Sequence, residues 1–188
     1  MSSYYDLEDL LAEEEPVSVI LRVAADGVGI LDPSSEDNNV EQGAKVDLPL
    51  WLAQDLFQRQ AAYITLPSYF NQRVRKEMQA DPGCVDIRSR CPYFYGVGCK
   101  LVPLTNDATL GSFLLYTLRG RYKDILSKSH SAAVSSTPKV MQILSREETT
   151  LFQAGRESMT AFKKWRLEGT RMERAAVLGK KRKPQGEL

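Results

Sequence analysis

The spacing of apolar residues along the chain changes near residue 67. Before that point, short runs alternate between apolar and polar positions, which is typical of strands with one buried face. The clearest run places these residues on one face of a strand: Val17, Val19, Leu21 and Val23. Further strands are predicted at VGIL (28–31), AKVDL (44–48) and AYITL (62–66), and Asp26-Gly27 is a typical hairpin turn before the first of them.

A helix is predicted to follow Pro49, because the missing N–H of proline costs nothing in a first helical turn. Its apolar face is expected to pack on the sheet and consists of Leu52, Ala53, Leu56 and Phe57. Trp51 lies about 100° from Leu52, so it either flanks this face or points away from it. A shorter apolar turn, with Leu7, Leu10 and Leu11, precedes the first strand.

After residue 67 the apolar residues recur every three to four positions, as in helices. Helices are predicted over 68–80, 107–126 and 148–169. The second has the widest apolar stripe: Leu110, Phe113, Leu114, Leu118, Tyr122, Ile125 and Leu126. The third opens with a predicted capping box, in which Ser145 is the cap and Glu148 reaches back.

Two segments between these helices are predicted to differ from them. Residues 85–104 contain Pro92, Gly96 and Gly98, which break any long helix, so we expect irregular structure or a short helix there. Residues 127–139 are rich in Ser, Thr and Ala and are predicted to form a mobile connector.

The fold class predicted from these patterns is α+β. A small β-rich domain with one helix is expected at 1–67 and a helical domain at 68–169, with the mobile loop at 127–139. Residues 170–188 are predicted to be a disordered basic tail, because they contain little that could pack.

Charge is distributed unevenly over the 188 residues, although the net charge is only +1. Residues 1–55 contain thirteen acidic and two basic residues, whereas residues 156–188 contain ten basic and four acidic residues. Such a chain can dock one part on another or bind charged partners at both ends. The plainer interpretation is that these are solvated faces of mixed sign.

Candidate chemistry is sparse. His130 is the only histidine and falls in the predicted connector, whereas a catalytic imidazole must be held in place. The three cysteines, Cys84, Cys91 and Cys99, form no CxxC pair suited to zinc. No cofactor, metal or catalytic residue is therefore predicted, and a thiol enzyme is a remote third class. No apolar run approaches the roughly 18 residues that a membrane span needs.

Three sequence features favour binding functions. Tyr93, Phe94 and Tyr95 are adjacent, and they either fill the chain's own core or anchor a partner. RYKDIL and FKKWRLEG mix bases with aromatics, as nucleic-acid binders do, although such bases often only solvate a helix. A short basic cluster fits a nuclear import signal: Lys180, Lys181, Arg182 and Lys183.

A resemblance to a known family appears at EQGAKVDLPLWLAQDL (41–56). This stretch resembles the Psf-three subunit of GINS, the four-protein eukaryotic replication assembly. Three more segments resemble that subunit in the same order: YYDLEDLLAEEEPV, ADPGCVDI followed by CPYFYGVGCKL, and LFQAGRESMTAFKKW. The likeness extends from Tyr4 to about Trp165, and the tail beyond Gly169 is not matched.

The resemblance implies a function that composition does not indicate. It implies a non-catalytic subunit of the GINS heterotetramer, nuclear and part of the replicative helicase. Implied partners are three other GINS subunits, the MCM ring and its activating partner, and the leading-strand DNA polymerase. The interface candidates on this interpretation are Trp51, Tyr93, Phe94, Tyr95, Phe113, Tyr116, Phe152 and Trp165. The alternative function is a nucleic-acid-binding adaptor, and direct contact with DNA stays open.

Overall fold

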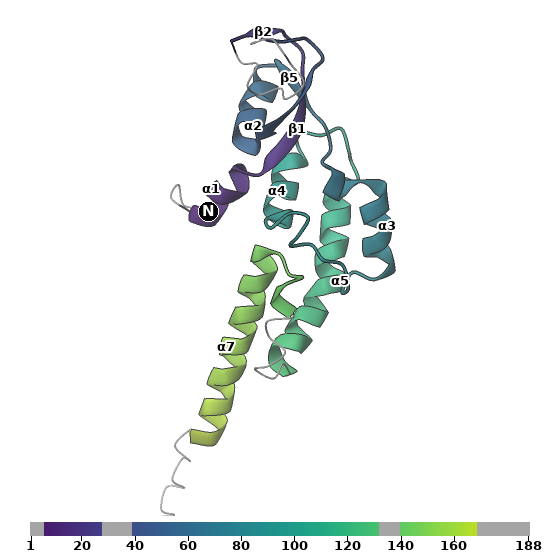
Figure 1. The fold of residues 1–188 in the computed structure, drawn as a ribbon. Coiled ribbons are helices and arrows are strands. Elements are labelled where there is room, and N and C mark those ends of the chain that lie inside the picture. The colour runs from purple at the N-terminus through teal and green to yellow at the C-terminus, as the bar shows by residue number, and fades with distance from the viewer. Residues whose placement is uncertain (1–5, 28–38, 132–139, 169–188) are drawn as a thin grey trace, which may run out of the picture.

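The computed structural model describes residues 6–27, 39–131 and 140–168. A small sheet with one covering helix lies at one end of the molecule, and helices form the rest (Figure 1). This arrangement confirms the predicted α+β class, with the β-rich part first. Four regions lie outside the described residues, namely the first five residues, the predicted VGIL strand, most of the connector and the basic tail.

The main sheet has three antiparallel strands in the order β4-β1-β5. Their bounds are β1 Pro16–Leu21, β4 Lys45–Pro49 and β5 Ala62–Ile64. Val19 pairs with Val46 on one side and with Ile64 on the other. The period-two pattern put Val17, Val19 and Leu21 on one face, and all three are buried. Val23 lies beyond β1 and is exposed, so its placement on that face was wrong.

A second, two-stranded sheet pairs β2 (Ala25–Asp26) with β3 (Asn39–Val40). Gly27 follows β2 with a φ of 78°, a left-handed conformation that glycine adopts without steric cost. Its amide N–H donates to the Asn39 side-chain oxygen at 3.2 Å. The two-residue hairpin turn predicted at Asp26-Gly27 is therefore wrong, because Asp26 belongs to β2 and pairs with Asn39. The return strand predicted at 28–31 lies outside the described residues.

Helix α2 (Leu50–Gln58) packs on the main sheet. Pro49 occupies the position before its first turn and has no N–H to satisfy there. Leu50 and Ala53 are completely buried, and Leu52, Leu56 and Phe57 pack partly buried against the same core. Helix α1 (Leu7–Glu13) contacts both α2 and α4.

The helical part begins with a short 3-10 helix, η2 (Ser68–Phe70), followed by α3 (Gln72–Ala80). Phe70, Val74 and Met78 are buried, as the helical period predicted. Asn71 separates the two elements because its side chain caps α3, accepting from the Val74 N–H at 2.9 Å.

Helix α4 (Phe94–Leu101) contains Gly96 and Gly98, the residues predicted to break a helix. The short-helix alternative is therefore correct, but Gly98 serves close packing instead of ending the helix. A Cβ at Gly98 would lie 2.8 Å from both methyl groups of Leu114 and 3.1 Å from the Phe70 ring. Only glycine lets α4 approach α5 and Phe70 this closely.

Helix α5 (Leu110–Ser131) corrects one prediction, the start of the loop at residue 127. It extends to Ser131, so residues 127–131 belong to a helix and not to a loop, and His130 is exposed on that helix. Its buried face includes Thr117 and Arg121, whereas Leu118 and Tyr122 are exposed. The reason is that α7 (Arg146–Glu168) packs on the side of α5 that carries Arg121, which forms an ion pair with Glu148.

One hydrophobic core joins the sheet to the helices. It includes Val19 of β1, Ala12 of α1, Ala53 of α2, Phe94 of α4 and Leu110 of α5. A smaller cluster between α5 and α7 (Arg146–Glu168) is formed by Ile125, Leu144 and Phe152. The two parts of the chain therefore pack on each other through shared apolar side chains.

Candidate functional site: interaction surfaces

A buried ion pair fixes the helices that carry the candidate surfaces. Arg121 of α5 donates from Nε to Glu148 Oε1 at 2.6 Å and from Nη2 to Oε2 at 2.9 Å. Both side chains are almost completely buried. Arg121 also donates to the backbone carbonyls of Pro82, Val85 and Ile143, the last two at 2.9 and 3.3 Å. This pair joins α5, α7 and two connecting segments.

Glu148 has a second role as the capping-box residue predicted from the sequence. Its Oε2 accepts from the Ser145 backbone N–H at 3.3 Å, and its own N–H donates to Ser145 Oγ at 3.2 Å. The capping box is therefore confirmed. The Tyr95 hydroxyl also donates to Glu148 Oε1 at 2.8 Å. Burial, and then the Glu148 charge, raise the pKa of Tyr95, so this hydroxyl keeps its proton and donates.

The three adjacent aromatics lie in the interior. Phe94 is fully buried, with ring centroids 4.8 Å from Phe70, 5.4 Å from Tyr95 and 6.4 Å from Phe113. Tyr93 is also buried, and Tyr95 is half-buried with its hydroxyl on Glu148. Of the two alternatives for this cluster, the structure favours a core role within the chain.

Two other interface candidates are also internal. Phe152 is fully buried between α5 and α7, and Phe113 of α5 is 7% exposed. The apolar pattern placed both correctly on their helices. A partner cannot reach the Phe94 or Phe152 ring unless the core opens, so these two rings belong to the fold and not to the surface.

The remaining candidates are exposed. Tyr116 of α5 is 50% exposed, Trp51 of α2 is 47% exposed and Trp165 of α7 is 70% exposed. Trp51 is therefore not part of the buried face of α2, which is formed by Leu50 and Ala53. The sequence pattern was compatible with Trp51 either flanking the apolar face of the helix or pointing away from it.

An apolar strip runs along the outer side of α5, which we name the outer α5 strip: Leu115, Leu118 and Tyr122. Their spacing of three and four residues puts them on one helical face, and each is between 37% and 49% exposed. The apolar stripe predicted on this helix included Leu118 and Tyr122 but not Leu115. Contiguous exposed apolar side chains are typical of a surface that binds another protein.

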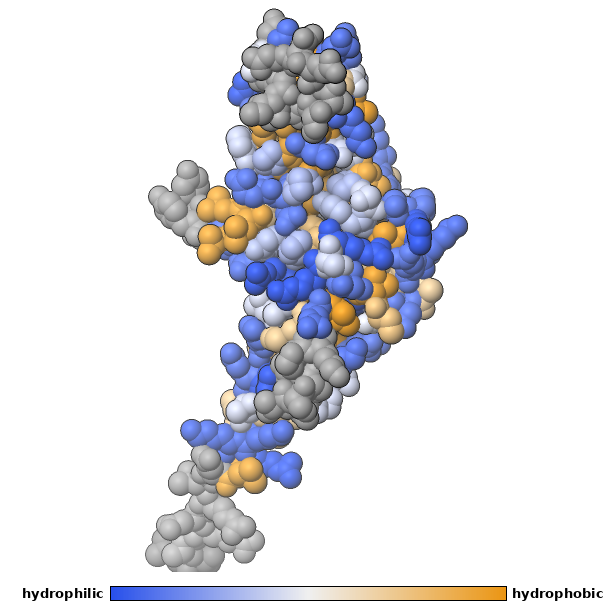
Figure 2. Space-filling view, in the orientation of Figure 1, coloured by the Kyte–Doolittle hydropathy of each residue, from blue (hydrophilic) through white to orange (hydrophobic). Residues whose placement is uncertain are grey.

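The end of α7 carries a second apolar group. Phe162 and Trp165 have ring centroids 5.8 Å apart, and both are exposed. Leu167 is exposed as well, and basic side chains stand between these residues: Lys163, Lys164 and Arg166. Figure 1 shows this half of α7 projecting from the body, and Figure 2 shows an apolar group near its end.

Helix α1 presents a third group, in which Leu7, Leu10 and Leu11 are exposed (Figure 2). The opposite side of α1 is held to α4 by Lys100, whose ammonium lies 2.7 Å from Asp9 and 2.8 Å from Glu13. The acidic N-terminal segment therefore meets a base of the helical part at this point.

The described residues offer little to chemistry. Among them, no group of three His, Cys, Asp or Glu side chains could hold a metal ion. Burial raises the pKa of Cys91 to about 12, and a hydrogen bond with Asp81 raises that of Cys84, which disfavours both thiolates. None of the described helices has the length and apolar character to cross a membrane. The import candidates Lys180–Lys183 lie outside the described residues.

Comparison with known families matches both parts of the chain in order. Residues 5–58 match the PSF3 N-terminal domain, and residues 69–167 match the GINS complex protein helical bundle domain. The chain belongs to the PSF3 family of GINS complex proteins. The family resemblance found in the sequence is thereby confirmed, and the second match begins two residues after the change of period at residue 67.

Relatives of this PSF3-family chain cover most of its length. It is 33% identical over 172 residues to the DNA replication complex GINS protein PSF3 of Homo sapiens. This match covers 87% of this chain and 80% of the human protein. It is 31% identical over 173 residues to the protein of the same name from Phaeosphaeria nodorum, with 88% and 96% covered. The Xenopus laevis protein is 29% identical over 167 residues.

Proposed function

We propose that this chain is a non-catalytic subunit of a GINS heterotetramer that acts in chromosomal DNA replication. The observation that carries the proposal is the family match in both parts of the chain, at 5–58 and 69–167. The relatives' names, which refer to a DNA replication complex, support the same role.

Three other GINS subunits are the proposed direct partners. The outer α5 strip and the end of α7 are the surfaces we assign to them, because both expose large apolar side chains on the helical part. Burying such a side chain contributes about 1.5–3 kcal/mol, so several together suit a permanent assembly. Of the sequence candidates, Tyr116 and Trp165 lie on these helices, and Trp51 is a candidate for the small domain.

Further proposals concern the assembly as a whole. We assign it to the replicative helicase, with the MCM ring and its activating partner as contacts, and the leading-strand DNA polymerase as another. Nuclear localisation follows from this role, and Lys180–Lys183 are the proposed import signal. Residues 1–67 and 68–169 are the proposed domains, although they share one hydrophobic core.

Co-expression tests the assembly. The full chain should co-purify with candidate partner subunits as a species whose mass, measured during size-exclusion chromatography, fits one copy of each. Leu118→Glu with Tyr122→Glu should reduce its yield, because two charges would be buried in an apolar interface. The matched control is Val23→Glu with Tyr63→Glu, which alters two exposed apolar residues of the small domain. An unchanged yield with the α5 pair would contradict this assignment.

The alternative function, a nucleic-acid-binding adaptor, is favoured by Lys163, Lys164 and Arg166 beside exposed aromatics on α7. Phosphate contacts would make DNA affinity fall steeply with salt. Binding of a labelled DNA by the isolated chain, measured at two salt concentrations, distinguishes the alternatives. Tight, salt-sensitive binding without any assembly would favour the adaptor.

A further inference from the structure

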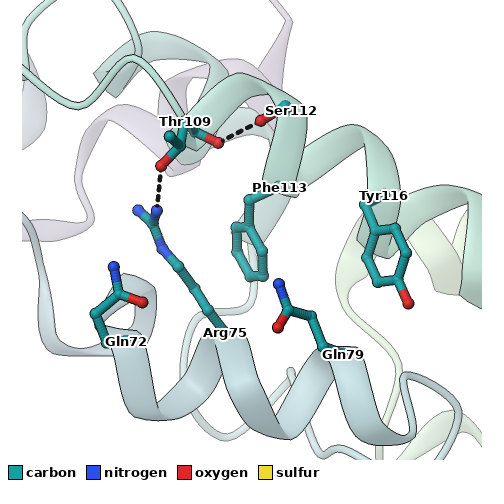
Figure 3. A pocket seen from close by; sticks show the side chains of 7 residues that line it. All are labelled: Gln72, Arg75, Gln79, Thr109, Ser112, Phe113 and Tyr116. Atoms are coloured by element: carbon teal, nitrogen blue, oxygen red, sulfur yellow. Dashed lines mark hydrogen bonds between the residues drawn. The ribbon is translucent and has the colours of Figure 1, made fainter.

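A groove lies between α3 and the first half of α5 (Figure 3). Its volume is about 480 Å³. Gln72 and Gln79 project into it from α3, and Ser112 and Tyr116 line it from α5, with the Phe113 ring between the two walls. Apart from Arg75, the groove is lined by neutral polar side chains and two aromatic rings.

The one guanidinium in the groove is already partnered. Arg75 donates to Thr109 Oγ1 at 2.7 Å and to Asp107 Oδ2 at 2.5 Å, and its Nε donates to the Phe70 carbonyl at 2.9 Å. Its guanidinium also lies 5.2 Å from the centre of the Phe113 ring. Because Asp107 neutralises it, the floor offers an apolar surface and no unpaired cation for a small anion.

The groove is short and bounded at one end. A Cβ at Gly120 would lie only 2.8 Å from the Pro82 ring, so α5 touches the turn after α3 there. Gln72 and Gln79 are seven residues apart on α3, which corresponds to about 10 Å of helix. This length accommodates one large side chain with a few flanking residues of a peptide.

The rim of the groove is positive. Lys76 stands between Gln72 and Gln79 on α3, at spacings of four and three that place it on the same side. Arg119 follows Tyr116 on α5 at a spacing of three. Both bases are exposed, and neither makes an ion pair with another residue that the structure describes. The groove lining itself includes no carboxylate.

We propose that this groove docks an acidic peptide segment of a partner protein. One large apolar side chain of the segment packs against the exposed ring of Tyr116 and the small accessible part of Phe113, and its carboxylates face Lys76 and Arg119. The glutamine amides bind the peptide backbone, since each amide both donates and accepts. Apolar anchoring with complementary charge at the rim is a recurrent way to recognise a peptide.

The test uses displayed random peptides of about 16 residues, selected on the full chain and compared on variants. The rim variant is Lys76→Glu with Arg119→Glu, and the wall variant is Tyr116→Ala. The control, Lys163→Glu with Lys164→Glu, makes the same charge change on exposed residues of α7. Circular dichroism establishes that each variant is folded.

We expect clones that depend on the rim to be rich in Asp and Glu and to share one aromatic or large aliphatic residue. A synthetic copy of such a peptide should bind about tenfold more weakly to the rim variant, and more weakly to Tyr116→Ala, with no change for the control. The proposal is overturned if no clone distinguishes the rim variant from the unchanged chain. It is equally overturned if the selected peptides lack acidic residues, or if single-stranded DNA occupies the groove in their place.

Discussion

Arg121 of α5 and Glu148 of α7 form a two-pronged ion pair in which both side chains are almost completely buried. Every nitrogen of the guanidinium has an acceptor, and the carboxylate also accepts from Tyr95 and Ser145. A buried pair with this degree of satisfaction sets the relative position of its helices, because any shift would leave a desolvated charge unpaired. The direction in which α7 presents Phe162 and Trp165 depends on it.

Breaking this pair should be costly. Glu148→Gln leaves Arg121 buried beside a neutral amide, and loss of one partner of a buried pair costs about 3–5 kcal/mol. The midpoint of urea unfolding measures the effect. Glu157→Gln, which removes an exposed charge from the same helix, should change stability by less than about 0.5 kcal/mol. Equal losses of stability for the two substitutions would contradict a stabilising role of the buried ion pair.

Gly98→Ala should destabilise the chain although alanine favours helices. The helix propensity gain is about 1 kcal/mol at most, whereas overpacking against Leu114 and Phe70 costs about 1–3 kcal/mol. Gly111→Ala is the matched comparison, since its Cβ would meet Val102 only at 3.9 Å. Thermal unfolding should therefore shift down for Gly98→Ala and slightly up for Gly111→Ala. A stabilised Gly98→Ala variant would contradict the close approach of α4 to α5.

Trp51→Ala should leave the stability of the small domain nearly unchanged, within about 0.5 kcal/mol, as for other surface positions. Leu50→Ala, at the fully buried neighbour, should cost about 2–5 kcal/mol. Complex yield measured on the same two variants then assigns a role to the indole. We expect Trp51→Ala to reduce the yield without lowering the unfolding temperature. Normal results in both assays would make Trp51 a bystander.

Asp107 should make stability depend on pH at the acid end. Hydrogen bonds from Thr109, and then from Arg75, lower the pKa of Asp107 from 3.8 to about 2. A carboxyl with a lowered pKa in the folded state stabilises the fold above its unfolded value, and this contribution is lost as pH falls through the folded value. The unfolding midpoint of Asp107→Asn should therefore be below that of the unchanged chain near neutral pH.

This difference should shrink between about pH 4 and pH 2, where the unchanged chain gains a proton at Asp107. Thr109→Ala retains the charge of Asp107 but removes the first of its hydrogen-bond partners. The loss of stability on acidification should therefore begin at higher pH in this variant. A difference between the unchanged chain and Asp107→Asn that stays constant over this range would contradict the role of the carboxylate charge.

Replacing Lys180, Lys181, Arg182 and Lys183 together with alanine should leave complex assembly intact and reduce nuclear accumulation. The reason is that a basic cluster of this kind is read as an import signal, while the surfaces proposed for assembly lie on α5 and α7. Fluorescence microscopy of the tagged chain and co-purification measure the two effects. Full nuclear accumulation of the variant would remove the proposed import role.

Local patterns of the sequence predicted much of the fold. The alternation at 17–21 predicted β1 and its buried face, because successive residues of a strand point to opposite sides. The spacing of Phe70, Val74 and Met78 predicted the buried side of η2 and α3. The Ser145–Glu148 box marked the start of α7, since its hydrogen bonds join residues only three positions apart. The small β-rich part followed by helices was predicted in the same way.

Tertiary packing decided what the patterns left open. The apolar stripe of α5 was wide enough to include Leu118 and Tyr122, but only the positions of α4 and α7 determined that Thr117 and Arg121 are buried instead. Similarly, the sequence pattern predicted that Gly98 interrupts a helix. In the structure it lies within α4, and a glycine is required there because Leu114 packs directly against it. A helical period gives the direction of a face, while the neighbouring helices determine how far burial extends around it. The same holds for the groove between α3 and α5, where Gln79 and Tyr116 are far apart in sequence and meet only because both helices pack through Arg75 and Phe113.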